Sequence, residues 1–281
     1  MIGAMKLSIM SYTFSRQGWK KNGRFDLEGM CCVARELNID GADIVTTHGL
    51  LPGDIRRILS DYGIKPVCHT FSADLNFATA FERVVGVDQI KAGVDVAAEI
   101  GAPLIMVITP GKEDMPRDVS RRRFIEGFRE SVGFAHSAGI TMTIENFPGA
   151  KSPFVISSDV LEAIREVPGL KLTFDNGNVL TGGENVAVSF MRCADHVVHA
   201  HFKDWVLAQP GRGMEGLDGR RYEGALIGEG IVPHHACLAA MRRAGYRGYI
   251  NLEYEGNKYP PDEATRRAAL CLKGIENECT E

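Results

Sequence analysis

The sequence TMTIENFPG at residues 141–149 sets a pattern that three later segments repeat. Those segments are LTFDNGN at 172–178, VVHAHFKD at 197–204 and INLEYEG at 250–256. Each begins with a short run of apolar and β-branched residues, which is typical of a buried strand. A titratable side chain ends each run, and these side chains are Glu145, Asp175, His201 and Glu253. In a parallel sheet the carboxyl ends of the strands share one edge, so we expect the four side chains to converge there.

The same alternation of a short strand and a longer helix extends over the whole chain. Strands are expected at residues 6–10, 42–45, 65–68, 104–108, 141–144, 172–174, 197–200 and 249–252. Helices are expected at 27–37 with Asp26 as N-cap, and at 53–62, 89–100, 118–138, 158–167, 184–193, 233–244 and 262–275. This count and a length of 281 residues predict an α/β protein with a single (β/α)8 TIM barrel domain over residues 1–281. A doubly wound open sheet is the alternative, but it usually has a glycine-rich turn after its first strand, which MSYTFSRQGW at 10–19 lacks.

Residues 203–231 do not follow this alternation of strands and helices, because they are polar and rich in glycine and show no helical or strand period. Long segments of this kind inside a compact domain usually serve a function. We therefore expect a long loop on the catalytic face of the barrel. His234 and His235 follow this segment in the first turn of a predicted helix, and we expect both on the surface.

Composition narrows the class of protein. Hydrophobic residues make up 44% of the chain and charged residues 24%, which excludes a disordered protein. A formal net charge of −4 indicates no nucleic acid as partner. We read neither a membrane span nor a signal peptide in the sequence. The chain has seven cysteines, an odd number, and no C-x-x-C pair, so we expect reduced thiols in a cytoplasmic protein rather than a disulfide framework or a thiolate zinc site.

The four converging side chains favour a metal site. Two Glu, one Asp and one His suit Mn²⁺, Mg²⁺, Co²⁺ or Zn²⁺. A single acid at a strand end commonly bonds to a loop instead, but four in register are harder to explain in that way. Three neighbouring carboxylates without a cation would repel one another and titrate at raised pH.

Several segments resemble a known family. TIENFPG, TFDNGNV, HAHFKDW, LIGEG and AGYRGYINLEYEG are similar to segments of the sugar phosphate isomerase/epimerase family, which has a xylose isomerase-like barrel. Its members include ketose 3-epimerases, hydroxypyruvate isomerases, inosose dehydratases and dehydroshikimate dehydratases. The resemblance implies a homo-oligomer that acts on a small sugar, sugar phosphate or cyclitol. It also implies one divalent metal ion held by Glu145, Asp175, His201 and Glu253.

The same resemblance implies a mechanism. Glu145 and Glu253 would flank the substrate as the catalytic residues, one removing a proton next to a carbonyl and the other returning it. The metal would stabilise the enediolate that forms. Many relatives carry a His three residues after the metal-binding Asp, where this chain has Asn178. An Arg that usually follows the histidine strand in ketose 3-epimerases has Arg212, Arg220 and Arg221 as candidates here, and we take Arg220 as the substrate-binding one.

Further side chains are expected near the mouth of the barrel. His69 ends the third strand, and Trp19 lies in the loop after the first strand, so both are candidates for substrate binding, as is Asn178. Lys203 matches the family's H-x-K-D pattern and could bind a substrate oxygen or pair with Asp204. His199 lies one inward position below His201 and is either a hydrogen-bonded core residue or a support for the metal ligands.

Other functions remain open from the sequence. A dehydratase could use the same metal and proton abstraction, followed by loss of a β-hydroxyl group. A phosphodiesterase of the endonuclease IV type would need three zinc ions and more histidines than the eight present. A non-catalytic sugar-binding barrel would not need the four titratable residues.

Overall fold

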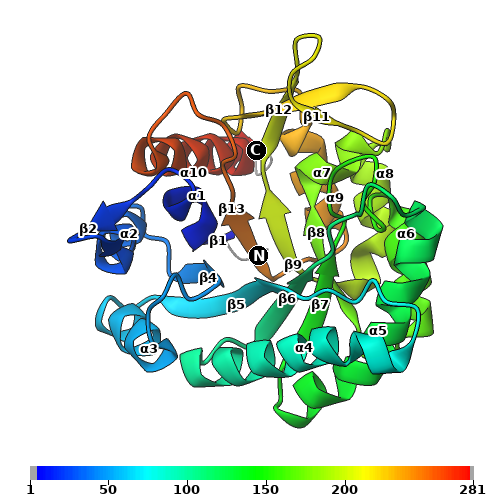
Figure 1. Cartoon of the computed structure of the whole chain (residues 1–281). Helices are drawn as coiled ribbons and strands as arrows, with labels where there is room; N and C mark the ends of the chain where they lie inside the picture. The colour runs from blue at the N-terminus through cyan, green and yellow to red at the C-terminus, as the bar shows by residue number, and fades with distance from the viewer. Residues whose placement is uncertain (1–4, 279–281) are drawn as a thin grey trace.

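The computed structural model describes residues 5–278, so both ends of the predicted domain, including Cys279, lie outside it. Eight parallel strands form a closed barrel in the spatial order β1-β13-β9-β8-β7-β6-β5-β4 (Figure 1). Their bounds are β1 Lys6–Met10, β4 Gly41–Val45, β5 Lys65–Ser72, β6 Leu104–Ile108, β7 Thr141–Glu145, β8 Lys171–Asp175, β9 Val197–Phe202 and β13 Tyr249–Leu252. The predicted (β/α)8 barrel is therefore confirmed.

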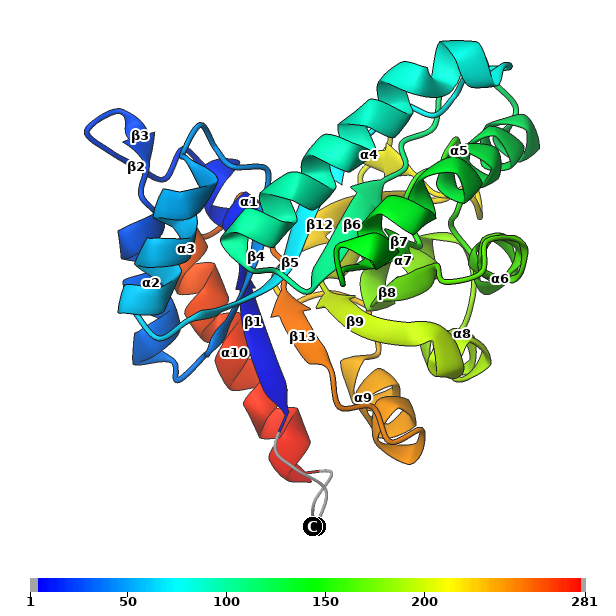
Figure 2. The same ribbon diagram turned by 90° about the horizontal axis from the view of Figure 1, so that it is seen from below.

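Helices surround the strands on the outside, as the view from below shows (Figure 2). The longer ones are α2 Leu27–Glu36, α3 Pro52–Asp61, α4 Ala80–Ile100, α5 Arg117–Ser137, α6 Ser157–Glu166, α8 Val186–Cys193, α9 His234–Arg243 and α10 Pro261–Glu278. The short elements are α1 Ser11–Ser15, α7 Asn176–Thr181 and the 3-10 turn Ala194–His196. No helix within residues 5–278 is long and apolar enough to cross a membrane.

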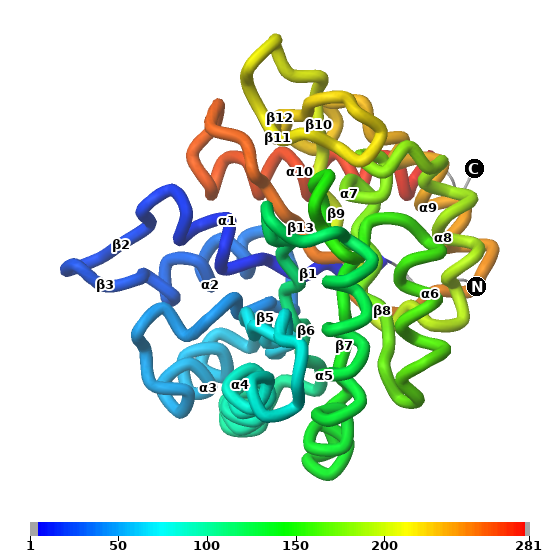
Figure 3. Tube along the Cα trace, turned by 45° about the vertical axis from the view of Figure 1, so that its right-hand side comes forward, coloured from blue at the N-terminus to red at the C-terminus, as the bar shows by residue number. Residues whose placement is uncertain are grey.

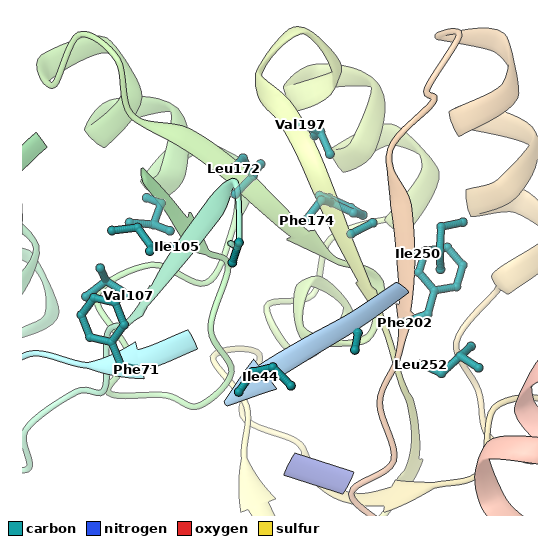
Figure 4. Packing of buried hydrophobic residues seen from close by; sticks show 14 of the residues in the cluster. Ile44, Phe71, Ile105, Val107, Leu172, Phe174, Val197, Phe202, Ile250 and Leu252 are labelled. Carbon is teal, nitrogen blue, oxygen red and sulfur yellow. The ribbon is translucent and has the colours of Figure 1, made fainter. Parts of the chain in front are cut away.

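The outward faces of the strands build the hydrophobic core. Side chains alternate between the two faces of a strand, and in β8 and β13 the outward positions are Leu172, Phe174, Ile250 and Leu252. Each of these side chains is at most 3% exposed, and they belong to the cluster shown in Figure 4. The hydrophobic effect thus holds the helices against the outside of the barrel.

The inward positions of β7, β8, β9 and β13 are polar, which is unusual because branched aliphatic side chains dominate most barrel interiors. Two levels can be distinguished along the strands that carry the four predicted ligands. The mouth level consists of Glu145, Asp175, His201 and Glu253. The inner level consists of the residues two positions earlier, Thr143, Thr173, His199 and Asn251. All the residues of the inner level are fully buried.

Two segments differ from the sequence predictions. Helix α4 begins at Ala80 rather than at residue 89, because Thr79 and Glu82 form a capping box. Residues 203–231 are not a patternless loop, since β10 Asp204–Leu207, β11 Met214–Glu215 and β12 Arg221–Ala225 form an antiparallel sheet. The three strands of this sheet lie together at one edge of the molecule. The hairpin of β2 Lys20–Lys21 and β3 Arg24–Phe25 projects from a different edge (Figure 3).

Asp204 connects the two ends of the segment 203–231, which contains this antiparallel sheet. Its carboxylate accepts hydrogen bonds from the backbone N–H groups of Gly228, Gly230 and Val232, at 2.9–3.0 Å. His234 Nε2 lies 3.1 Å from the same carboxylate, and His234 is only 4% exposed. The expectation that His234 lies on the surface is therefore wrong. The sequence around His234 did not reveal its burial, because its partner Asp204 comes from a distant part of the chain. Lys203 does not pair with Asp204, whose oxygens are already engaged.

Candidate metal centre

The structure brings the four predicted ligands together at the mouth of the barrel. One ligand atom from each of the mouth-level residues lies within 4.8 Å of the others. Glu145, Asp175 and His201 lie on β7, β8 and β9, and Glu253 follows β13 directly. All four side chains are at most 6% exposed.

The chain next to these residues fixes their spacing. Asn146 bridges two strand ends, because its Nδ2 donates to the carbonyl oxygen of Asp175 at 2.7 Å and its Oδ1 accepts from the Asp175 N–H at 2.9 Å. Asp175 Oδ1 caps helix α7 by accepting from the N–H of Asn178 at 2.7 Å. The other oxygen, Oδ2, is left to face the cluster. Glu145 and Asp175 thus sit on neighbouring strands that one amide side chain holds in place.

Lys203 supplies positive charge to the cluster. Its Nζ lies 2.9 Å from Glu253 Oε1, 2.7 Å from Glu255 Oε1 and 3.4 Å from Asp175 Oδ2. Lys203 itself is 3% exposed. One ammonium group therefore faces three carboxylates, and more negative than positive charge remains at the site.

Burial and the neighbouring charges shift the pKa values of the mouth-level residues. Burial raises the pKa of Asp175, and Glu145 raises it further although Lys203 opposes the shift. Burial likewise raises the pKa of Glu253, assisted by Glu255. Burial works against the charged form of His201, but hydrogen bonds to Asp43 and Glu145 raise its pKa well above the usual value. Burial is the largest cause of the raised carboxyl pKa values, and the neighbouring acids add to it.

Two buried oxygens test whether a cation fits here. Asp175 Oδ2 and Glu253 Oε2 have no hydrogen-bond partner, and buried carboxylate oxygens are rarely left so. The 3.4 Å contact of Asp175 Oδ2 with Lys203 is an ion pair without hydrogen-bond geometry. Three carboxylates and one imidazole form a donor set that suits Mn²⁺, Mg²⁺, Co²⁺ or Zn²⁺. The residues present therefore fit a divalent ion.

A second group of possible ligands lies deeper in the barrel. Asp43, His199 and His201 also offer ligand atoms within 4.8 Å of one another. Here the carboxylate is fully engaged, since Oδ2 lies 2.6 Å from His199 Nε2 and 3.2 Å from His201 Nε2, and Oδ1 accepts from Ser8 Oγ at 3.2 Å. These bonds hold the pKa of Asp43 below its usual range despite the opposing effect of burial. Both oxygens of Asp43 thus have partners, unlike the unpartnered carboxylate oxygens at the mouth, although His199 Nδ1 has none.

Asp43 and Glu255 were missed in the sequence. Asp43 lies in the middle of the strand GADIV, and the available signal was an acid inside an otherwise apolar run. Glu255 lies two residues after Glu253, which puts both within reach of Lys203. Tyr12 is a further neighbour, because burial and then the charges of Glu255 and Glu253 raise its pKa.

The predicted substrate-binding residues divide into two sets. Lys203 contacts the mouth-level carboxylates. Asn178 follows Asp175 on α7, is fully buried, and has no hydrogen-bond partner for either amide atom. His69 is 3% exposed, lies 3.0 Å through Nδ1 from the carbonyl oxygen of Ile44, and has a pKa lowered by burial.

Trp19 and Arg220, the other two predicted substrate-binding residues, form their contacts with residues outside the mouth level. Trp19 donates Nε1–H to the carbonyl oxygen of Asp26 at 3.1 Å. It also lines a hollow of about 640 Å³ with Phe25 and His48, in loops that follow β1 and β4. Arg220 lies in the segment 203–231 that contains the antiparallel sheet. Its side chain is 59% exposed and pairs with Asp218 at 2.8 Å. A substrate contact of either residue stays a prediction.

Comparison with known proteins places the chain in a family. A curated relative, the L-ribulose-5-phosphate 3-epimerase UlaE of Salmonella paratyphi C, is 24% identical over 208 residues. The match covers 69% of this chain and 66% of the relative, so just under two thirds of the relative's length is spanned.

Solved structures agree in fold. The probable 3-DHS dehydratase AsbF from Bacillus anthracis has a TM-score of 0.75 at 16% identity, over 96% of this chain and 99% of that chain. The IOLI protein with a bound zinc atom has a TM-score of 0.78 at 15% identity, over 96% of this chain and 98% of that chain. The model of a xylose isomerase-like TIM barrel matches residues 33–275. The chain therefore belongs to the xylose isomerase-like TIM barrel family.

Proposed function

We propose that the protein is a divalent-metal-dependent isomerase or epimerase of a sugar, a sugar phosphate or a cyclitol. The observation that carries the proposal is the set of mouth-level residues, with two buried carboxylate oxygens that lack a partner. The relationship to a sugar-phosphate 3-epimerase supports this class of reaction. Glu145, Asp175, Glu253 and Nδ1 of His201 would hold the ion.

The chain's own groups suit proton transfer next to a carbonyl. Glu145 and Glu253 are two carboxylates at one buried site, and one would remove the proton while the other returns it through an enediolate. When bound, the cation supplies Lewis-acid stabilisation of the negative charge on the substrate oxygens. Burial keeps water away from both carboxylates, which strengthens their electrostatic interactions with the substrate.

The contact with Lys203 supports a role for Glu253 both in binding an ion and as a base. Its Nζ holds Glu253 Oε1 at 2.9 Å, whereas Oε2 is free of hydrogen bonds. The two oxygens of Glu253 therefore have different environments, which suits a residue that would both hold an ion and act as a base. Asn178 would orient a hydroxyl group of the substrate, since its unpartnered amide offers both a donor and an acceptor.

Exchange of solvent deuterium into a panel of keto sugars, their 5-phosphates and inososes tests the proposal. The Mn²⁺-loaded protein should incorporate deuterium at the carbon next to the carbonyl, and Glu145→Gln should abolish incorporation while part of the metal binding remains. Glu166→Gln, on the outer surface where Glu166 pairs with Arg129, is the matched control. Absence of exchange with every substrate would contradict the proposal.

The same samples distinguish the other functions. An α,β-unsaturated product would identify a dehydratase that uses the same site. Three zinc ions per chain would indicate a phosphodiesterase of the endonuclease IV type. Tight binding of a sugar without exchange or turnover would indicate a binding protein.

A further inference from the structure

Asp43 lies across the barrel from the strand that carries the histidine ligand. It belongs to β4, whereas His199 and His201 belong to β9, and β1 and β13 separate these strands in the barrel. Asp43, His199 and His201 are all fully buried. Its contact with His201 therefore joins two sides of the interior, directly below the mouth level.

His201 is held at both of its ring nitrogens. Nε2 lies 3.2 Å from Asp43 Oδ2, and Nδ1 lies 2.7 Å from Glu145 Oε1 and 3.6 Å from Glu253 Oε2. A carboxylate can only accept hydrogen bonds, so Asp43 requires the proton of His201 on Nε2. Glu145 places the same requirement on Nδ1 in the metal-free protein, so both ring nitrogens carry a proton there. A cation that replaces the proton on Nδ1 would leave a neutral ring, with the remaining proton on Nε2 and donated to Asp43.

We propose that Asp43 is a positioning residue, which fixes the tautomer and the ring orientation of His201 so that Nδ1 faces the cation. The inference rests on the proposed metal site but not on the identity of the substrate. Carboxylates that bond to the second nitrogen of a metal-binding histidine have this effect in general, and their loss typically weakens metal binding about 10–100-fold.

Two neighbours hold Asp43 in this position. His199 Nε2 lies 2.6 Å from Asp43 Oδ2, the same oxygen that contacts His201. The rings of His199 and His201 meet edge to face at an interplanar angle of 89°, with centroids 5.2 Å apart. Ser8 Oγ donates to the other oxygen at 3.2 Å. His199 and Ser8 therefore restrain the carboxylate from opposite ends, and Ser8 does so without touching His201.

The contrast with Ser8 separates positioning from mere support of the fold. Calorimetric titration with Mn²⁺ should show an affinity about 10–100-fold weaker for Asp43→Asn than for the wild type. Ser8→Ala removes a hydrogen bond from the same carboxylate and should leave the affinity near that of the wild type. Thermal unfolding of each metal-free protein reports the loss of stability separately from the loss of affinity.

The outcomes are distinct. Equal affinity of folded Asp43→Asn and the wild type would overturn the inference alone, as would an equal loss in Ser8→Ala and Asp43→Asn. Failure of the wild type to bind Mn²⁺ would overturn the proposed metal site and the inference with it. Two ions per chain would show that the deeper group is itself a metal site and would likewise overturn the positioning role.

A measurement on the wild type covers the case in which Asp43→Asn does not fold. In the zinc-loaded protein labelled with ¹⁵N at histidine, the resonances of His201 should show a metal on Nδ1 and a proton on Nε2. A variant lacking His201, such as His201→Gln, assigns these resonances. A metal on Nε2 would contradict the role of Asp43.

Discussion

The mouth level and the inner level of the barrel lie along the same four strands but differ in which kinds of buried atom lack a hydrogen-bond partner. In the inner level, Thr143 and Thr173 hydrogen-bond to each other at 2.8 Å, and His199 contacts Asp43 at 2.6 Å. In the mouth level, two positions later, Asp175 and Glu253 each keep a buried oxygen without a partner. The mouth level therefore keeps unpartnered oxygens on acidic side chains. The inner level also has unpartnered atoms, His199 Nδ1 and both amide atoms of Asn251, but none of them is a carboxylate oxygen.

The comparison teaches that burial and polarity do not by themselves mark a ligand site. Both levels are buried and polar, and both contain groups of possible metal ligands. Both levels contain unpartnered buried atoms, and the difference lies in charge. At the mouth these atoms are carboxylate oxygens, which are costly to bury unless something binds to them. The unpartnered carboxylate oxygens therefore support the proposed cation site at the mouth rather than at the inner level.

Loss of a mouth-level carboxylate should have the largest effect on cation binding. Asp175→Asn removes the charge of the unpartnered oxygen, yet Asn can still cap helix α7 as Asp175 does. The affinity for Mn²⁺ should fall by more than the roughly 100-fold upper range expected for outer partners of a ligand. Calorimetric titration measures this effect, and an affinity close to that of the wild type would remove Asp175 from the ligand set.

Replacement of Lys203 should affect the metal-free protein more than the loaded one. Lys203→Met leaves the carboxylates of Glu253 and Glu255 without their ammonium partner, and loss of one partner from a buried ion pair costs about 3–5 kcal/mol. Because a cation can replace part of the missing charge, Mn²⁺ should raise the melting temperature more in this variant than in the wild type. Thermal melts with and without Mn²⁺ provide the test, and an equal increase in both proteins would contradict this account of Lys203.

Removal of the metal should make stability depend on pH. The folded metal-free protein has raised pKa values at Asp175 and Glu253, so it binds more protons than the unfolded chain above the ordinary carboxyl pKa of about 4. These groups should therefore lower the free energy of unfolding as the pH rises from about 4 towards neutrality, by up to about 1.4 kcal/mol per pH unit for each extra bound proton.

Urea unfolding of chelated protein, compared with the chelated Glu253→Gln variant, isolates this contribution. The variant lacks the titration of residue 253 and should lose less stability over the same pH range. An identical pH dependence in the two proteins would show that Glu253 does not titrate with a raised pKa.

A change in the inner level away from Asp43 should affect cation binding least. Thr143→Val removes the bond to Thr173 and the 2.9 Å bond to the carbonyl oxygen of Ile105. The groups left unpaired should cost about 1–3 kcal/mol of stability. Mn²⁺ affinity should stay near that of the wild type, and a large loss of affinity without loss of stability would break the distinction between the two levels.

The sequence predicted the barrel and the four clustered residues because each of those features is local. An apolar run followed directly by Glu145 or Asp175 can be read within a few residues, and parallel topology then brings the strand ends together. Features that depend on distant partners were not predicted. Asp43 meets His199 across 156 positions of sequence, and His234 meets Asp204 across 30.

The missed helical turns have a different physical cause. The first part of α4 exposes Phe81, Val84 and Val85 to solvent, so apolar residues occur on its outer face as well as its buried face. An amphipathic period is therefore weak there, and the capping box at Thr79 was the signal that marked the start.

Metal content per chain, measured by elemental analysis of the wild type, Glu253→Gln and Glu255→Gln after loading with Mn²⁺ and desalting, tests the central claim most directly. Lys203 contacts both acids, but only Glu253 belongs to the ligand group. We expect one ion per chain in the wild type and in Glu255→Gln, and a loss of the ion in Glu253→Gln. Absence of metal from the wild type, or equal retention in all three proteins, would contradict the assignment of the mouth level as a metal centre.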